Sequence, residues 1–134
     1  MKREILFQLD IVWQLFEYHC HDLSEKEAMW CKTTQGLQIR KTDDMWKADW
    51  PDTETYEIGP ASIVWIMWHI TYWWKNVLSA SKDNKIMAKE DVIWPGSVEL
   101  AIEEIRKCHE DWIGFVESLS EIGRASCRER VYVL

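Results

Sequence analysis

The distribution of apolar residues along the chain constrains its fold more than any other feature. Two stretches, near residues 3–23 and 97–119, place an apolar or imidazole side chain alternately every four and every three positions, which is the repeat of one helix face. The first repeat is Ile5, Leu9, Val12, Phe16, His19 and Leu23, and the second is Val98, Ile102, Ile105, His109, Trp112, Val116 and Leu119. A third stretch, residues 61–81, is apolar on nearly every face between positions 63 and 74, so we expect it to be the most buried helix. The pattern predicts an all-α bundle.

Residues at the starts of these stretches favour helix initiation. Pro60 suits the first turn of the second helix, and Ser62 reads as a helix-start residue. Ser97 is the expected N-cap of the third helix. Ser24 with Glu27 has the spacing of a capping box, which predicts one short additional turn of helix.

The connections between the helices differ in length and character. About 35 residues join the first helix to the second, and two strand-like pieces within them, 37–41 and 45–50, predict a small β-hairpin that turns at 42–44. About 15 residues join the second helix to the third, enough for a crossover that leaves those two helices parallel.

Composition excludes several classes of protein. A chain of 134 residues has room for one domain, and its net charge of −7 with no basic face argues against a nucleic-acid partner. The most apolar run has 12 residues, whereas a membrane span needs about 20, so we expect no membrane insertion. No secretory signal is evident and the four cysteines form no CxxC pair, which predicts reduced thiols and a cytoplasmic location. Ten tryptophans indicate deep burial or an aromatic-lined cavity.

Three histidines fall on the apolar faces of three different helices, and each allows two interpretations. Taken singly, His19, His69 and His109 are core residues with one hydrogen-bond partner each. Taken together, they resemble a bundle-core metal site in which facing helices each give a ligand. If the second and third helices run parallel, His69 and His109 lie about 6 Å apart along the axis and could share one ion.

The tryptophans beside His69 also allow two interpretations. Trp65, Trp68 and Trp73 are core residues by default, and walls of a pocket beside His69 in the alternative, with His19 reaching that pocket from the end of the first helix.

Four segments together resemble a Trp-rich branch of the DinB-like superfamily. They are GPASIVWIMWHI at 59–70 with YWW at 72–74, ILFQLD at 5–10, ADWP at 48–51 and WPGS at 94–97. The resemblance implies an up-down-down-up four-helix bundle, often a homodimer, whose members hold a divalent metal with three histidines and act as thiol transferases or metal-dependent hydrolases. It further implies that His69 is a ligand of Zn²⁺ or Ni²⁺. His109 as a second ligand is an inference from its position in this chain.

The chain departs from that pattern at its C-terminal end. The family's fourth helix, with its HxxxH ligand pair, has no counterpart here, so we expect a DinB-like domain over 1–120 that is incomplete and unstable alone. Residues 121–134 are expected to be a non-native tail, because 122–131 can be back-translated into a string that resembles a common sequencing adapter.

Two functions remain open from the sequence. The first is a metal-dependent transferase or hydrolase whose small-molecule or thiol substrate is unknown. The second is a non-catalytic helical module that binds a small apolar ligand or a protein partner through a Trp-rich surface.

Overall fold

A computed structural model describes residues 2–51 and 59–119 of the chain. Helix α1 (Lys2–Cys20) is followed by the short helix α2 (Glu25–Ala28) and by a hairpin of strands β1 (Ile39–Thr42) and β2 (Met45–Ala48). Helix α3 (Ile63–Asp83), a 3₁₀ turn η1 (Lys89–Asp91) and helix α4 (Val98–Ser118) complete the described elements. The mostly helical fold with a small insertion between the first two long helices was predicted.

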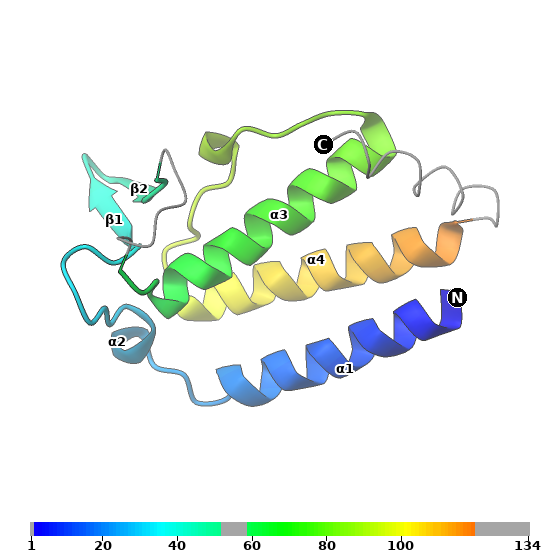
Figure 1. Ribbon diagram of the computed structural model, residues 1–134, viewed down its shortest axis with the longest axis horizontal. Coiled ribbons are helices and arrows are strands. Elements are labelled where there is room, and N and C mark those ends of the chain that lie inside the picture. The colour runs from blue at the N-terminus through cyan, green and yellow to red at the C-terminus, as the bar shows by residue number, and fades with distance from the viewer. Residues whose placement is uncertain (1, 52–58, 120–134) are drawn as a thin grey trace.

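The three long helices lie side by side, with α4 in contact with both α1 and α3 (Figure 1). Helices α3 and α4 run in the same direction and α1 runs in the opposite one (Figure 1). The crossover through η1 therefore leaves α3 and α4 parallel, as its length predicted. The predicted tail, 121–134, lies outside the described residues.

Serine side chains begin α3 and α4. Ser62 Oγ accepts a hydrogen bond from the Trp65 backbone N–H, and Ser97 Oγ accepts one from Leu100 N–H. The capping box of Ser24 and Glu27 is present at α2, so these three predicted helix starts are confirmed. Pro60, in contrast, lies before the first turn of α3.

Helix α1 is shorter than expected and the least buried of the long helices. It ends at Cys20, and the left-handed backbone of Asp22 (φ 59°) turns the chain away before Leu23. No residue of α1 is fully buried. It packs against α4.

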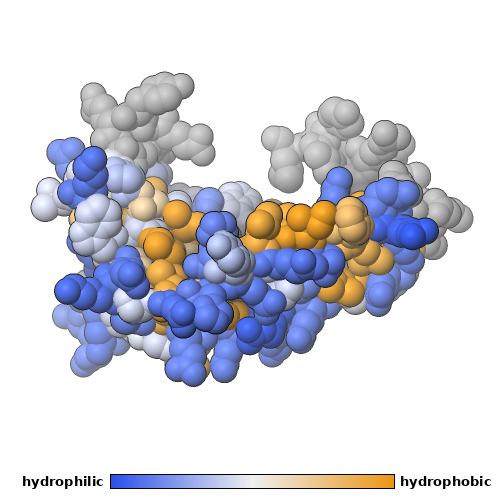
Figure 2. Space-filling model, turned by 90° about the horizontal axis from the view of Figure 1, so that it is seen from below, coloured by the Kyte–Doolittle hydropathy of each residue, from blue (hydrophilic) through white to orange (hydrophobic). Residues whose placement is uncertain are grey.

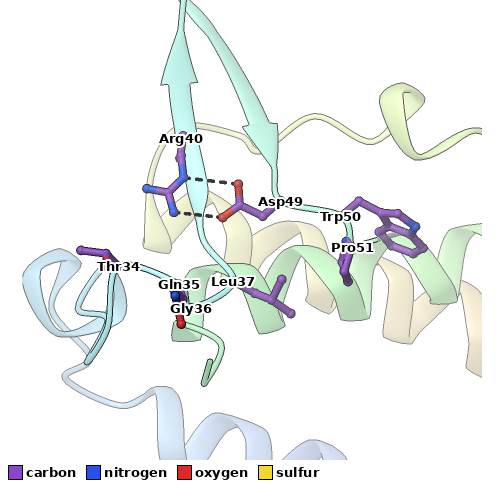
Figure 3. Close-up of a pocket in the computed structure, with 8 residues that line it drawn as sticks. All are labelled: Thr34, Gln35, Gly36, Leu37, Arg40, Asp49, Trp50 and Pro51. Atoms are coloured by element: carbon purple, nitrogen blue, oxygen red, sulfur yellow. Dashed lines mark hydrogen bonds and ion pairs between the residues drawn. The ribbon is translucent and has the colours of Figure 1, made fainter. Parts of the chain in front are cut away.

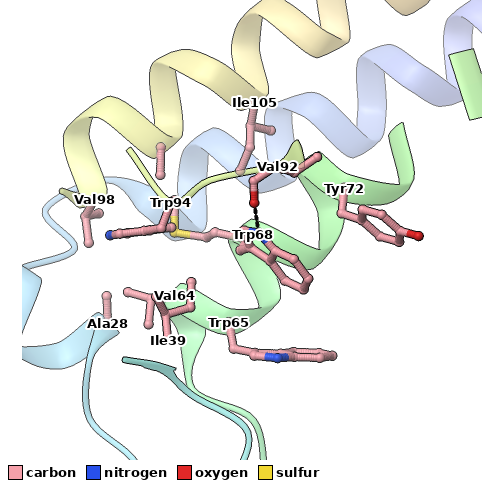
Figure 4. Packing of buried hydrophobic residues seen from close by; sticks show 12 residues of the cluster. Ala28, Ile39, Val64, Trp65, Trp68, Tyr72, Val92, Trp94, Val98 and Ile105 are labelled. Atoms are coloured by element: carbon pink, nitrogen blue, oxygen red, sulfur yellow. Dashed lines mark hydrogen bonds between the residues drawn. The ribbon is translucent and has the colours of Figure 1, made fainter. Parts of the chain in front are cut away.

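The hydrophobic core lies at the other side of α4, between α3, α4 and the segments that cross them (Figure 4). Ile39 of the hairpin, Val64 and Met67 of α3, and Ile105 of α4 are almost inaccessible to solvent. Burial of such side chains contributes about 1.5–3 kcal/mol each. Helix α3, which was expected to be the most buried helix, has seven buried residues against six in α4 and none in α1.

The long connection returns to the start of α3 through a close backbone contact. Gly36 and Gly59 form an isolated parallel bridge, and a methyl group at Gly36 would overlap the Pro60 carbonyl oxygen. Ser62 N–H donates to the Leu37 carbonyl at 2.9 Å. The bridge and this hydrogen bond together hold the hairpin beside the first turns of α3.

The hairpin has the predicted turn. Thr42 pairs with Met45, and Asp43 and Asp44 both take left-handed conformations between them (φ 50° and 61°).

Among the described residues, none of the helices is long and apolar enough to cross a membrane.

Candidate aromatic surface around His69

Three indole rings surround the His69 imidazole. Trp65, one turn earlier on α3, stacks on it with ring centroids 4.5 Å apart and an interplanar angle of 20°. Trp73, one turn later, meets it edge-on at 6.1 Å, and Trp50 lies at 6.1 Å and a tilt of 48°. Residues 65, 69 and 73 lie four apart, so the helical repeat itself places them on adjacent turns of one face.

The His69 imidazole is held in its neutral form. Trp73 Nε1 donates a hydrogen bond to His69 Nε2 at 2.7 Å, so this nitrogen is the acceptor and Nδ1 carries the proton. Burial lowers the pKa of His69 below its ordinary value, because a charged imidazolium loses hydration there. The surface therefore offers flat apolar rings, and His69 contributes an N–H donor and no charge at neutral pH.

Trp50 reaches this surface from the segment after β2. The Asp49 carbonyl accepts a hydrogen bond from Trp65 Nε1 at 2.7 Å, which ties the segment to α3. Lys89 Nζ lies 5.5 Å from the centre of the Trp50 ring. Sequence reasoning did not place Trp50 in a site, although the ADWP segment at 48–51 was one of the four that carried the family resemblance.

Two residues predicted to line this pocket lie elsewhere. Trp68 is buried in the core, where its Nε1 donates to the Val92 carbonyl at 2.6 Å (Figure 4). It faces Trp65 and Trp50 rather than His69. His19 is exposed at the end of α1, with Tyr18 5.4 Å away. His19 lies in the last turns of α1, whereas Trp13 and Phe16 are the α1 side chains that pack against the core, so the apolar repeat did not bring His19 into the bundle interior.

His109 occupies a different place, in the interior between the three helices. Trp13 of α1 stacks on it at 4.5 Å and 13°, and Trp74 of α3 lies at 6.3 Å. His109 is 6% exposed, and its Nε2 has no hydrogen-bond partner among the described residues.

The structure does not bring His69 and His109 into one site. Their surrounding rings, given above, have no member in common. Trp74, which faces His109, is five residues after His69 and hence about 140° around the helix from it. Axial proximity suggested a shared ion, but rotation about α3 separates the two side chains.

A three-ligand metal site does not fit the described side chains. Among residues 2–51 and 59–119, no group of three or more His, Cys, Asp or Glu side chains is placed to hold an ion. Of the two ring nitrogens of His69, Nε2 already accepts the Trp73 N–H. Binding a metal there would require Trp73 to move.

The described residues contain at least two hollows. One, of about 330 Å³, adjoins Trp50 beneath the hairpin, where the Arg40 guanidinium pairs with Asp49 at 3.1 Å (Figure 3). The other, of about 610 Å³, lies along α4 beside the ion pair of Lys75 and Glu104. Cys108 lines the second hollow, and burial raises the pKa of its thiol, so it is a weak nucleophile.

A comparison with known protein families identifies the family of the chain. Residues 8–126 match the DinB superfamily, and the chain belongs to that family. No curated protein and no solved structure matches the chain significantly.

Proposed function

We propose that this DinB-superfamily protein binds a flat, largely apolar small molecule on the aromatic surface formed by Trp50, His69 and Trp73, with the buried Trp65 stacked against His69. The observation that carries the proposal is the gathering of three indoles around a neutral imidazole that is only partly covered. Trp73 remains 45% exposed, and Trp50 and His69 are half-buried. Exposed rings of this kind leave apolar surface in contact with water unless another molecule packs on them.

The polar groups of the surface define what a ligand would need. His69 Nδ1–H is a single donor, so an acceptor atom on the ligand edge would orient it. Aromatic ligands gain about 0.5–1.5 kcal/mol per ring contact beyond the area that they bury. A hydroxyl or carbonyl on a fused-ring molecule meets both requirements.

The test uses 2-naphthol as the probe and cyclohexanol as its non-planar counterpart, with binding followed by calorimetry. We expect 2-naphthol to bind and cyclohexanol to bind much more weakly. Trp73→Ala should weaken 2-naphthol binding about two- to tenfold. Trp30→Ala is the matched control, because Trp30 is 66% exposed and outside the surface. Equal binding of both probes, or equal losses in both variants, would contradict the proposal.

A metal-dependent transferase or hydrolase is the second candidate. Family membership supports it, because DinB-superfamily proteins commonly bind divalent metals, and His69 stands at the position that the resemblance assigns to a ligand. The described donor set does not fit such a centre, so no catalytic step can be assigned to particular residues of this chain.

Titration of the full chain with Zn²⁺ and with Ni²⁺ separates the two candidates. Stoichiometric binding that is lost in His69→Ala and strengthened in Trp73→Phe would favour the enzyme. Binding that is unchanged in His69→Ala would remove His69 from any metal site.

A further inference from the structure

Exposed apolar side chains alone do not select a ligand for this protein. Seen from the side of α1, hydrophobic residues lie at the surface between hydrophilic ones (Figure 2). Ile5, Val12 and Leu15 of α1 are among the exposed hydrophobic side chains. A purely apolar molecule would therefore find more than one place to bind. The charged groups beside the aromatic surface are the features that distinguish one apolar ligand from another.

Lys89 of η1 is held beside the aromatic surface by Trp50. Its ammonium lies 5.5 Å from the centre of the Trp50 ring, within the range of a cation–π contact. The His69 ring lies 6.1 Å from the same indole. A ligand of two fused rings that contacts Trp50 therefore has both the Lys89 ammonium and the His69 N–H within reach of its edge.

Lys89 forms a loose ion pair with its neighbour in the chain. Its Nζ lies 3.8 Å from the Glu90 carboxylate, and the Glu90 side chain is 72% exposed. Because water screens an exposed pair at this distance, the attraction contributes little. Lys89 can therefore exchange Glu90 for an acidic group on a ligand at small cost.

Other carboxylates around the aromatic surface have partners of their own. Asp49 accepts two hydrogen bonds from the Arg40 guanidinium, at 3.3 and 3.1 Å. Asp91 accepts the Ala88 N–H at 3.0 Å. Helix α3 has no Asp or Glu before Asp83. An anion would therefore meet the ammonium without facing an unpaired carboxylate of these segments.

We infer that the ligand of the aromatic surface is an aromatic carboxylate, whose rings lie on the indoles and whose acidic group lies beside Lys89. The inference rests on the proposed binding function and names the class of ligand. A carboxylate carries one negative charge, which matches the single ammonium of Lys89. Aromatic cations are disfavoured at the same place, because the ammonium repels them.

The experiment compares 2-naphthoate with 2-naphthamide, which has a similar shape and no charge, by calorimetry on the full chain at neutral pH. We expect 2-naphthoate to bind about two- to fivefold more tightly, as for one exposed ion pair. Lys89→Met keeps most of the apolar stem, so it should remove this preference and leave 2-naphthamide binding unchanged. Lys82→Met is the matched control and should keep the preference, because Lys82 lies over the Phe115 ring of α4, at 5.9 Å.

Two further measurements separate charge from shape. Lys89→Arg retains the positive charge and should retain the preference for 2-naphthoate. In the wild type, added salt should bring the affinity for 2-naphthoate toward that for 2-naphthamide, because salt screens an exposed pair. The salt series decides the inference by itself, should circular dichroism show that Lys89→Met has lost its helices.

The outcomes also separate this inference from the proposed function. Equal binding of the two probes to the wild type would overturn the inference and leave the binding of flat aromatic molecules standing. A preference that salt does not change, or that Lys82→Met and Lys89→Met reduce equally, would overturn it as well. If neither probe binds, the inference and the proposed function fail together.

Discussion

His69 and His109 are both surrounded by tryptophan, yet their ring nitrogens have different surroundings. His69 is half-buried, and its Nε2 accepts the indole N–H of Trp73. His109 is buried between three helices, and its Nε2 has no described partner. The difference teaches that an imidazole on an apolar helix face becomes a surface or a core residue according to what crosses that face. The face that carries His69 is crossed by a single segment that follows the hairpin, whereas the face that carries His109 is covered by two helices.

The largest expected difference between the two is in stability. His109→Ala removes a ring packed between Trp13 and Trp74, so it should lower the free energy of unfolding by about 2–4 kcal/mol. His69→Ala should cost about 1 kcal/mol or less, because its ring is partly in solvent. Urea denaturation of both variants measures the difference. Equal losses of unfolding free energy in the two variants would contradict the difference between the two sites.

A substitution that keeps the ring shape sharpens the same point. His109→Phe retains the stacking and removes the unpartnered nitrogen, so its stability should equal or exceed that of the wild type. Urea denaturation of His109→Phe, His109→Ala and the wild type measures the three stabilities. A loss as large as that of the alanine variant would mean that Nε2 has a partner outside the described residues.

The fold was largely predictable because it depends on local signals. Ser24, Ser62 and Ser97 cap helices wherever the chain places them, and the apolar repeats mark helix faces without tertiary information. The site was less predictable, because Trp50 meets His69 only after the hairpin folds back on α3. Nothing in the repeat of α3 distinguishes the buried Trp68 from the exposed Trp73 until the neighbours of each are known.

Acid should reduce the stability of the protein through His69. Burial lowers the pKa of His69, so the folded protein binds that proton less tightly than the unfolded chain, whose histidines titrate near about 6.5. Stability that depends on neutral His69 is present above that pH and is lost as the pH falls from there toward the folded pKa. The loss should be small because the ring is partly exposed. Comparing the denaturation midpoints of the wild type and His69→Gln across this window isolates the contribution, and identical pH profiles would contradict it.

The smallest expected effect concerns the hydrogen bond from Trp73. Trp73→Phe keeps an aromatic ring but removes the indole donor, which favours the neutral imidazole. The pKa of His69 should therefore rise, toward its ordinary value, in an NMR titration. Trp30→Phe provides the control and should leave it unchanged. A fall in the pKa of His69 would show that the bond does not stabilise the neutral form.

One measurement tests the central claim, that the rings around His69 form a binding surface while His109 belongs to the core. The imidazole and indole NMR signals of the full chain are followed during titration with 2-naphthol. We predict that the signals of His69 and Trp73 shift together and saturate, while those of His109 and Trp13 stay in place. Shifts at His109 with none at His69 would contradict the claim.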